Sequence, residues 1–417
     1  MMNPLSDISS GKFGQKTGDN MISFDKAYRI VLDHPGDFGI EQVDLSEAGN
    51  RVLAKNIIAD RDYPPFDRAT KDGIALRYKD ANKNTPLVIK GIVAAGTPRQ
   101  KLPKGQNCME IMTGAVVPLN ADTVVMYEDI DVSNGQAHLN KQPEKGQNIH
   151  LKGSDDNKGA LLISAGKRIG ASEIGIMATV GKSSVEVKKL PSVAVVSTGN
   201  ELVDIDKEPL PHQIRRSNAY TLRAALSVQN ITPSLHHLPD DPQMIRNQLQ
   251  ELVRSQDVLI LSGGVSMGKF DYIPKILAEL KVDKLFHRVK QRPGKPFWFG
   301  RHNDYNTWVF SFPGNPVSTF INHHIYFNDW LRASLGLAQQ QFNVILKEEL
   351  MIQGSLTRFI GVKTVWDNGK LLASTVKSNS SGDLISLASY DGFIRLDPQK
   401  HPYKKDEAVS FIPTRLY

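Results

Sequence analysis

The strongest constraint on the fold is an alternation of apolar and amphipathic segments between about residues 192 and 335. Three short apolar runs, SVAVVS (192–197), DVLILS (257–262) and WVFSF (308–312), have the character of buried strands, and a weaker strand is expected near 234–239. Segments with helical spacing lie between and after them, at 218–230, 241–256, 272–281 and 317–336. Strands that alternate with helices predict right-handed crossovers and a mostly parallel sheet covered on both faces, that is, a three-layer α/β domain.

The helix expected at 241–256 has the clearest local signals. Asp241 can cap its N-terminus, and Pro242 occupies the first helical position, where a missing N–H costs nothing. The apolar residues Ile245, Leu249 and Leu252 form a stripe along one side. We therefore expect this helix to pack against the sheet.

Flanking regions have a different character, and 417 residues are too many for one core. Residues 1–20 read as a mobile polar tail. Residues 21–45 and 146–188 are expected to form a helical linking domain, with Ser172 as a possible cap of a helix at 171–180 and a polar link at 181–191. Residues 46–145 read as a β-rich domain, 189–336 as the α/β domain and 337–417 as a C-terminal β-barrel or sandwich, with Asn134-Gly135 and Asn368-Gly369 as hairpin turns.

Composition excludes several classes of protein. With 40% hydrophobic and 23% charged residues the chain is of ordinary globular type, and no run of about 18 apolar residues predicts a membrane span. The net charge of +7 favours anionic partners, but the basic residues form no stripe of the kind that nucleic acids require. The single cysteine, Cys108, lies in an apolar run and is expected to be a buried thiol, which fits a reducing cytoplasm.

Three glycine-rich segments follow the three apolar strands and carry the first candidate site. In an open parallel sheet, ligands bind at the carboxyl ends of the strands, where glycines let backbone N–H groups approach an anion. We therefore expect an anionic, phosphorylated ligand at this edge. The residues predicted to contact it are Gly199, Ser262, Gly263, Gly264, Ser266, Pro313, Gly314 and Asn315.

The middle segment comes close to a phosphate-binding loop of nucleoside triphosphatases, but Phe270 follows Lys269 where a magnesium-binding Ser or Thr is required. A cation could instead be held by carboxylates in the loops beside these turns. Mg²⁺ prefers one or two carboxylates together with substrate phosphates. Glu201, Asp240 and Asp271 are the predicted metal ligands, whereas Asp241 is better explained as a helix cap.

A basic turn provides a second candidate site. Arg288, Arg292 and Lys295 lie in or beside Gln291-Arg-Pro-Gly-Lys-Pro296, where proline and glycine predict a rigid turn. Fixed guanidinium groups offer forked donors that remain charged, which suits an oxyanion. A solvated basic loop is the alternative interpretation.

These motifs together resemble the molybdopterin molybdenumtransferase family, known as MoeA in bacteria and as the E domain of gephyrin in animals. The likeness extends over residues 21–417. The segments that carry it are Asp62-Tyr-Pro-Pro-Phe-Asp67 with Asp72-Gly73, Ile111-Met-Thr-Gly-Ala115, Gly146-Gln-Asn-Ile149, Ser197-Thr-Gly-Asn-Glu201, Asp240-Asp-Pro242, Ser262-Gly-Gly-Val-Ser266 with Asp271-Tyr272, Arg292-Pro-Gly-Lys-Pro296 and Pro313-Gly-Asn-Pro316.

The resemblance implies a reaction in which adenylylated molybdopterin is bound, its phosphoanhydride is cleaved, molybdate is inserted at the dithiolene and AMP leaves, with Mg²⁺ assisting. It implies a homodimer whose site is shared between subunits, and a molybdopterin adenylyltransferase as a candidate partner. Residues carried over by the resemblance are Glu201, Asp240 and Asp271 on the α/β side, Asp72, Thr113 and Asp155 from the other subunit, and Arg288, Arg292, Lys295, Arg358 and Ser381 as oxyanion contacts.

One loop departs from the family pattern. Where the family has Ser-x-Met-Asp-Gly-Tyr-Ala, this chain has Ala69-Thr-Lys-Asp-Gly-Ile-Ala75, which places Lys71 beside Asp72. The altered loop favours one alternative, a non-catalytic pterin-binding scaffold. A second alternative is a molybdopterin adenylyltransferase, since the resemblance implies that a related α/β domain performs this earlier step of the same pathway.

Overall fold

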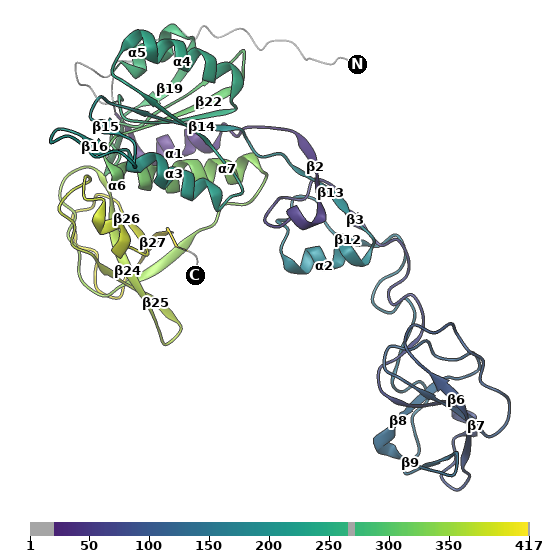
Figure 1. The fold of residues 1–417 in the computed structure, drawn as a ribbon. Coiled ribbons are helices and arrows are strands. Elements are labelled where there is room, and N and C mark those ends of the chain that lie inside the picture. The colour runs from purple at the N-terminus through teal and green to yellow at the C-terminus, as the bar shows by residue number, and fades with distance from the viewer. Residues whose placement is uncertain (1–20, 266–271, 416–417) are drawn as a thin grey trace, which may run out of the picture. The chain divides into compact units, whose positions relative to one another are not determined.

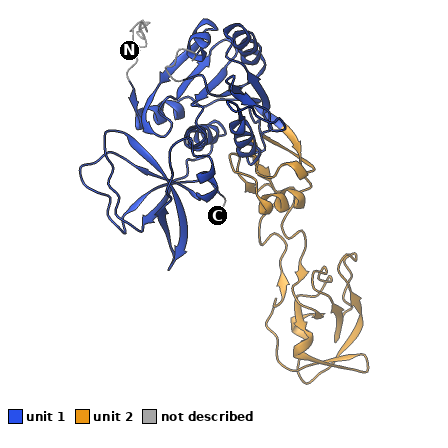
Figure 2. Cartoon of the chain, turned by 60° about the vertical axis from the view of Figure 1, so that its left-hand side comes forward, with its two compact units in different colours: residues 1–41, 188–417 blue, residues 42–187 orange. Residues whose placement is uncertain are grey.

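The computed structural model describes residues 21–265 and 272–415 of the chain. It divides into two compact units: unit 1 comprises residues 1–41 and 188–417, and unit 2 comprises residues 42–187 (Figure 2). The predicted mobile tail at 1–20, and the predicted site residues Ser266 and Asp271, lie outside the described residues. In the described part of the chain, no helix has the length and apolar character needed to span a lipid bilayer.

The described residues of unit 1 contain a six-stranded sheet in the order β17-β14-β18-β22-β21-β19. Its first four strands, β17 (Ser234–Leu238), β14 (Val193–Thr198), β18 (Val258–Ser262) and β22 (Thr307–Phe312), are parallel to one another. This confirms the predicted mostly parallel sheet. Two further strands, β21 (Trp298–His302) and β19 (Val282–His287), add an antiparallel edge that the sequence pattern did not reveal.

Helices cover both faces of this sheet, as predicted (Figure 1). On one face lie α4 (Pro242–Ser255) and α5 (Ile273–Glu279), whose buried apolar residues share a core with the sheet. Asp241 caps α4 as expected, because its side chain accepts a hydrogen bond from the Met244 N–H at 2.8 Å. On the other face lie α3 (Ser217–Ser227), α6 (Pro316–Asn322) and α7 (Asn328–Ser334). A π-helical turn, His323–Phe327, joins α6 to α7, so the single long helix expected at 317–336 contains a local change of winding.

The first described helix, α1 (Phe24–Leu32), packs in unit 1, whereas the sequence grouped residues 21–45 with 146–188. Strand β1 (Ile22–Ser23) pairs in parallel with β20 (Val289–Arg292), and α1 contacts α7. The Tyr28 hydroxyl donates to Asp329 at 2.5 Å, and the Arg395 guanidinium lies 4.4 Å from the Phe24 ring centroid. These contacts fix α1 against elements far away in the sequence.

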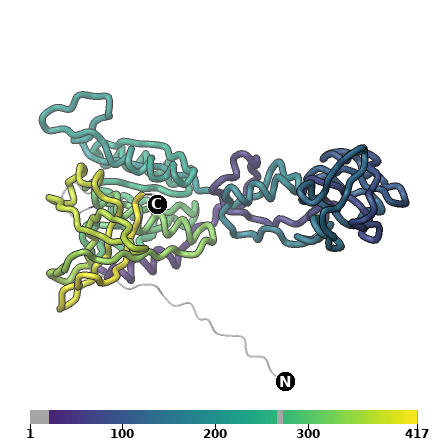
Figure 3. Tube along the Cα trace, turned by 90° about the horizontal axis from the view of Figure 1, so that it is seen from below, coloured from purple at the N-terminus to yellow at the C-terminus, as the bar shows by residue number. Residues whose placement is uncertain are grey.

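The C-terminal strands form a closed, barrel-like sheet, which confirms the barrel alternative of the prediction. It contains β23 (Phe342–Leu346), β24 (Thr357–Asp367), β25 (Lys370–Thr375), β26 (Gly392–Leu396) and β27 (Ala408–Pro413), and β24 closes the ring by pairing with β26. Asn368 and Gly369 turn the β24–β25 hairpin with positive φ angles of 47° and 76°. Strand β20 also pairs with β24, so the barrel is connected to the α/β part of unit 1 through strand pairing. Figure 3 shows the C-terminal part of the chain, in yellow, beside the α/β part.

Unit 2 has two parts. The first is a six-stranded sheet of β5 (Gly73–Leu76), β6 (Leu87–Val93), β7 (Asn107–Ile111), β8 (Thr123–Met126), β9 (Ile130–Ser133) and β10 (Gln136–Leu139), in which Asn134 and Gly135 turn the β9–β10 hairpin as predicted. Cys108 is buried there, and burial raises the pKa of its thiol to about 12, in agreement with the predicted inert cysteine. The short pair β4 (Arg68–Ala69)–β11 (Ile149–His150) also belongs to this first part, because Ala69 and Ile149 pack in its core. The second part contains α2 (Ala171–Thr179) and the short pair β3 (Ile57–Ile58)–β12 (Leu161–Ile163).

Two local predictions were wrong. Ser172 does not cap α2: the helix is preceded by Gly170, and the Gly170 N–H donates to the Glu173 carboxylate at 2.9 Å. The segment 181–191 is not a mere polar link, because residues Ser184–Lys188 form strand β13, which pairs with β2 (Ile40–Asp44). The partner of β13 lies far away in the sequence, whereas the group that satisfies the start of α2 is a carboxylate in its own first turn.

Candidate functional site

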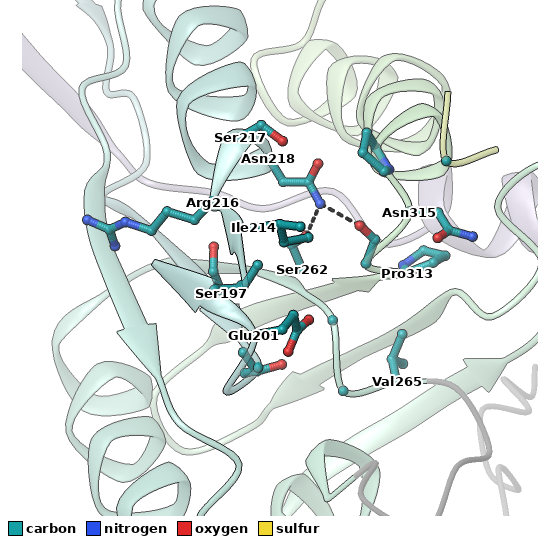
Figure 4. A pocket seen from close by; sticks show the side chains of 18 of the residues that line it. Ser197, Glu201, Ile214, Arg216, Ser217, Asn218, Ser262, Val265, Pro313 and Asn315 are labelled. Atoms are coloured by element: carbon teal, nitrogen blue, oxygen red, sulfur yellow. Dashed lines mark hydrogen bonds between the residues drawn. The ribbon is translucent and has the colours of Figure 1, made fainter. Parts of the chain in front are cut away.

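A cavity of about 620 Å³ opens at the carboxyl ends of β14, β18 and β22 (Figure 4). All three glycine-rich segments contribute to its wall, as the parallel arrangement of the strands requires. Of the residues predicted from the sequence, those that line it are Gly199, Glu201, Asp240, Ser262, Gly263, Gly264, Pro313, Gly314 and Asn315. The prediction that the turns converge on one edge is therefore confirmed.

In the second of the three glycine-rich turns, Gly263 and Gly264 pack closely against Thr198. Gly263 and Gly264 have φ angles of +102° and +64°, a region that residues with a side chain rarely adopt. A Cβ at either position would lie 2.9 Å from the Thr198 hydroxyl oxygen. Thr198 is buried, and its hydroxyl has no hydrogen-bond partner in the structure, as is also true of Ser197. Both residues line the cavity, with their unpaired hydroxyl oxygens buried beneath its surface.

Two of the predicted metal-binding carboxylates lie on the same cavity. Glu201 follows the β14 turn, and Asp240 follows β17. Asn200 and Asp240 hold the two loops together: the Asp240 N–H donates to the Asn200 side-chain oxygen at 3.0 Å, and the Asn200 N–H donates to the Asp240 carboxylate at 3.3 Å. Two carboxylates on one cavity fit the ligand set of Mg²⁺, which takes its remaining ligands from water and phosphate. Within residues 21–265 and 272–415 they are not part of a larger cluster of three or more metal-ligating side chains.

Sequence reasoning missed one side of the cavity. Residues Ile214, Arg215, Arg216, Ser217 and Asn218 line it from the segment that leads into α3. Arg216 forms an ion pair with Asp204 at 2.5 Å, and Asn218 donates to Ser262 and to the Gly314 carbonyl. The only local signal was a basic pair followed by Ser and Asn at the start of a predicted helix, and without the tertiary structure nothing connected it with the glycine turns.

The basic turn lies differently from the prediction. Arg288, Arg292 and Lys295 are not among the residues that line the cavity, although the next residue, Pro296, is. Strand β20 carries Arg292 into register with Arg358 of β24, and the pKa of the Arg358 guanidinium is lowered by burial and by the charge of Arg292. The two positively charged guanidinium groups repel each other, and an oxyanion bound beside them would offset this repulsion.

The rigidity predicted for this turn has an identifiable cause. The buried Gln291 side chain donates to the Pro293 carbonyl at 3.0 Å and to the Asn322 side-chain oxygen at 2.8 Å, and it accepts a hydrogen bond from the Tyr326 hydroxyl. Asn322 in turn donates to the Gly294 carbonyl at 3.2 Å. A buried network of this kind keeps the turn in a single conformation. Ser381, also predicted from the resemblance, accepts a hydrogen bond from the Asn315 amide at 3.0 Å and so lies at the edge of the cavity, next to Gly382.

The remaining predicted residues belong to unit 2. The Thr113 N–H donates to the Asp72 carboxylate at 2.6 Å, and this bond lowers the pKa of Asp72 below its usual value. Asp155 lies 2.7 Å from the His150 Nε2 atom, and the Arg68 guanidinium lies 3.1 Å from the other ring nitrogen of His150. Asp72 and Thr113 are thus in contact, whereas the hydrogen bonds of Asp155 tie it to a separate group of side chains.

The parallel sheet and the glycine turns around a cavity at its carboxyl edge define the class: an α/β protein with an open parallel sheet and a cavity at the edge where such sheets bind their ligands. Three family models match successive parts of the chain: the MoeA N-terminal region (domains I and II) at residues 22–181, the probable molybdopterin-binding domain at 194–333 and the MoeA C-terminal region (domain IV) at 343–414.

Curated relatives match over nearly their whole length. The molybdopterin molybdenumtransferase of Synechocystis is 36% identical over 94% of this chain and 99% of its own, and that of Bacillus subtilis is 31% identical over 94% of each. Two solved structures of the molybdopterin biosynthesis MoeA protein from Pyrococcus horikoshii, 29% and 26% identical, have TM-scores of 0.80 and 0.79 and cover 95% and 94% of this chain and 100% and 99% of theirs. This chain belongs to the molybdopterin molybdenumtransferase (MoeA) family of transferases.

Proposed function

We propose that the protein acts in molybdenum cofactor biosynthesis, binding adenylylated molybdopterin, inserting molybdate at its dithiolene and releasing AMP. The observation that carries the proposal is the single cavity that combines three glycine turns with Glu201 and Asp240. Cleavage of a phosphoanhydride needs positioning and charge neutralisation more than it needs a protein nucleophile. The cavity offers backbone N–H groups and hydroxyl groups for phosphate oxygens, and carboxylates for a cation.

Glu201 and Asp240 are the described residues that would hold Mg²⁺, and Asp271 remains a predicted third ligand. When bound, the cation would supply Lewis-acid neutralisation of phosphate charge. The residues of the chain have their own tasks: the turns at Gly199, Gly263 and Gly314 admit the phosphate groups closely, and the cavity wall limits the access of water.

The basic turn is the proposed site for molybdate or for a further phosphate. Arg292 and Arg358 are adjacent in the sheet, the Gln291 network holds the turn, and Ser381 is linked to the cavity through Asn315. Arg288 and Lys295 flank the same turn, which supports their assignment as oxyanion contacts. This arrangement would keep the molybdate site and the phosphate-binding turns distinct but close.

We also propose that the protein works as a homodimer in which Asp72, Thr113 and Asp155 of one copy complete the site of the other. The support is the resemblance together with the preorganisation of Asp72 by the Thr113 N–H. Mixing the Glu201→Gln variant with the Asp72→Asn variant, both of which are expected to be impaired, tests this idea. Activity that recovers on mixing supports a shared site, and mixtures no more active than the separate variants contradict it.

The central experiment incubates the purified protein with adenylylated molybdopterin, molybdate and Mg²⁺ and follows the release of AMP. Release that requires molybdate and Mg²⁺ is the expected result. Binding of the pterin without AMP release would identify a scaffold instead, and consumption of ATP in the absence of molybdate would identify an adenylyltransferase.

A further inference from the structure

We propose that Asn218 is a positioning residue of the cavity, one that sets the orientation of two of the proposed phosphate-binding groups, the Ser262 hydroxyl and the Gly314–Asn315 peptide. The inference rests on the proposed function for the identity of the ligand. Its geometric basis is independent of that function, because it consists of hydrogen bonds within unit 1 (Figure 4).

Asn218 lies in the first turn of α3 and reaches across the cavity wall to two other elements. Its amide nitrogen donates to the Ser262 hydroxyl oxygen, at the end of β18, at 2.8 Å, and to the Gly314 carbonyl, between β22 and α6, at 2.7 Å. A third contact, to the Thr319 hydroxyl oxygen, is longer at 3.4 Å. An amide has two N–H groups, so the two short bonds account for both of them.

The bond to Ser262 decides what the serine can do. Because the serine oxygen accepts from Asn218, the proton of its own hydroxyl is left for a different acceptor. The alternative acceptor within the protein is the Thr319 hydroxyl oxygen, whose separation of 3.5 Å from the Ser262 oxygen is long for a hydrogen bond between hydroxyl groups. Ser262 is 3% exposed and lines the cavity, so a phosphate oxygen bound there would be a better acceptor for its proton.

The bond to Gly314 acts on the backbone. A trans peptide is planar, with its C=O and its N–H pointing in opposite directions. When Asn218 holds the Gly314 carbonyl, the N–H of Asn315 must point away from Asn218. This peptide lies in the wall of the cavity, between β22 and α6. Asn218 therefore fixes the direction of the Asn315 N–H, which would donate to the anion, without itself donating to the anion.

The test is Asn218→Asp, which keeps the shape of the side chain but replaces the two donors by a carboxylate facing two oxygen atoms. Asn247→Asp is the matched control, because Asn247 makes its own side-chain hydrogen bond on the remote helix α4. Loss of a hydrogen bond to a polar group that must stay paired is expected to weaken binding about 10- to 100-fold. Because these groups hold the phosphate before and during cleavage, KM for adenylylated molybdopterin should rise by that factor, with kcat changed less than about threefold.

Binding of AMP alone, measured by calorimetry, provides a readout that does not depend on catalysis and should weaken in parallel. Asn218→Ala combined with Ser262→Ala should lose less than the product of the two separate losses, since the two residues act through one hydrogen bond. The inference is overturned if Asn218→Asp and Asn247→Asp have equal KM and equal affinity for AMP, or if the unfolding midpoint falls far enough to account for the loss. Failure of the wild-type protein to release AMP would instead contradict the proposed function.

Discussion

The two units of the molecule hold their predicted functional acids in different ways. In unit 1, Glu201 and Asp240 follow two neighbouring parallel strands, β14 and β17, and line a cavity whose wall is formed by residues of that unit. In unit 2, Asp72 and Asp155 are exposed, and each is already engaged, Asp72 with the Thr113 N–H and Asp155 with His150. Unit 1 thus holds its acids on a cavity, whereas unit 2 exposes acids that are already hydrogen-bonded. Under the proposed function, the first pair would hold the ligand and the second pair would contribute charge to the site of another copy.

The largest effect is therefore expected in unit 1. Glu201→Gln removes a negative charge from the cavity and should lower the rate of AMP release about 100-fold or more, the scale on which electrostatic groups contribute to such reactions. Glu208→Gln, at an exposed residue a short distance further along the chain, is the control. Equal rates for the two variants, measured at saturating Mg²⁺, would remove Glu201 from the site.

The glycine turns allow a test by backbone geometry. Gly264→Ala forces a side chain into a φ angle of +64° and places its Cβ 2.8 Å from Ile273, so we expect a loss of about 1–3 kcal/mol in the free energy of unfolding of unit 1, together with weaker ligand binding. Gly354→Ala has a similar φ of +90° but open space around it. Urea unfolding should show the larger loss for Gly264→Ala, and equal losses would mean that the close packing on Thr198 and Ile273 is unimportant.

A smaller effect is expected for unit 2. Asp72→Asn keeps an acceptor for the Thr113 N–H but removes a charge that the lowered pKa of Asp72 keeps ionised at neutral pH. AMP release should fall about tenfold, the scale of one general electrostatic contact, with an unchanged unfolding midpoint. Asp122→Asn, which alters a carboxylate bound to the Tyr78 N–H, should leave the rate unaltered. Undiminished release by Asp72→Asn would show that the altered loop around Asp72 has lost its role.

The smallest expected effect concerns stability alone. The ion pair with Lys167 and the bond from the Gly170 N–H lower the pKa of Glu173 to about 2. A carboxylate with a lowered pKa stabilises the fold above its unfolded value, near 4.5, and this contribution is lost as the pH falls toward 2. Thermal unfolding of Glu173→Gln should start lower than that of the wild type at pH 7, and the difference should disappear near pH 2. A difference that is constant over this range would assign the effect to packing.

Much of the α/β architecture could be predicted from local patterns. Apolar runs such as 257–262 are long enough for one buried strand, the stripe of Ile245 and Leu249 identifies a helix face, and glycines after the strands mark the edge where ligands bind. These features are local because burial of a strand or a helix face is reflected in the spacing of its own apolar residues. The convergence of Gly199, Gly263 and Gly314 on one cavity follows from the parallel order of the strands.

What the sequence determined by itself was therefore the type and order of the main elements, the sheet edge at which the cavity lies and, through its dispersed motifs, the family. The tertiary structure alone decided which distant groups meet: Asn218 with Ser262 and Gly314, Arg292 with Arg358, and β13 with β2. The physical reason is that these contacts depend on strand pairing and packing between segments that are far apart in the chain. A residue that makes one hydrogen bond across such a distance leaves no periodic trace in its own neighbourhood.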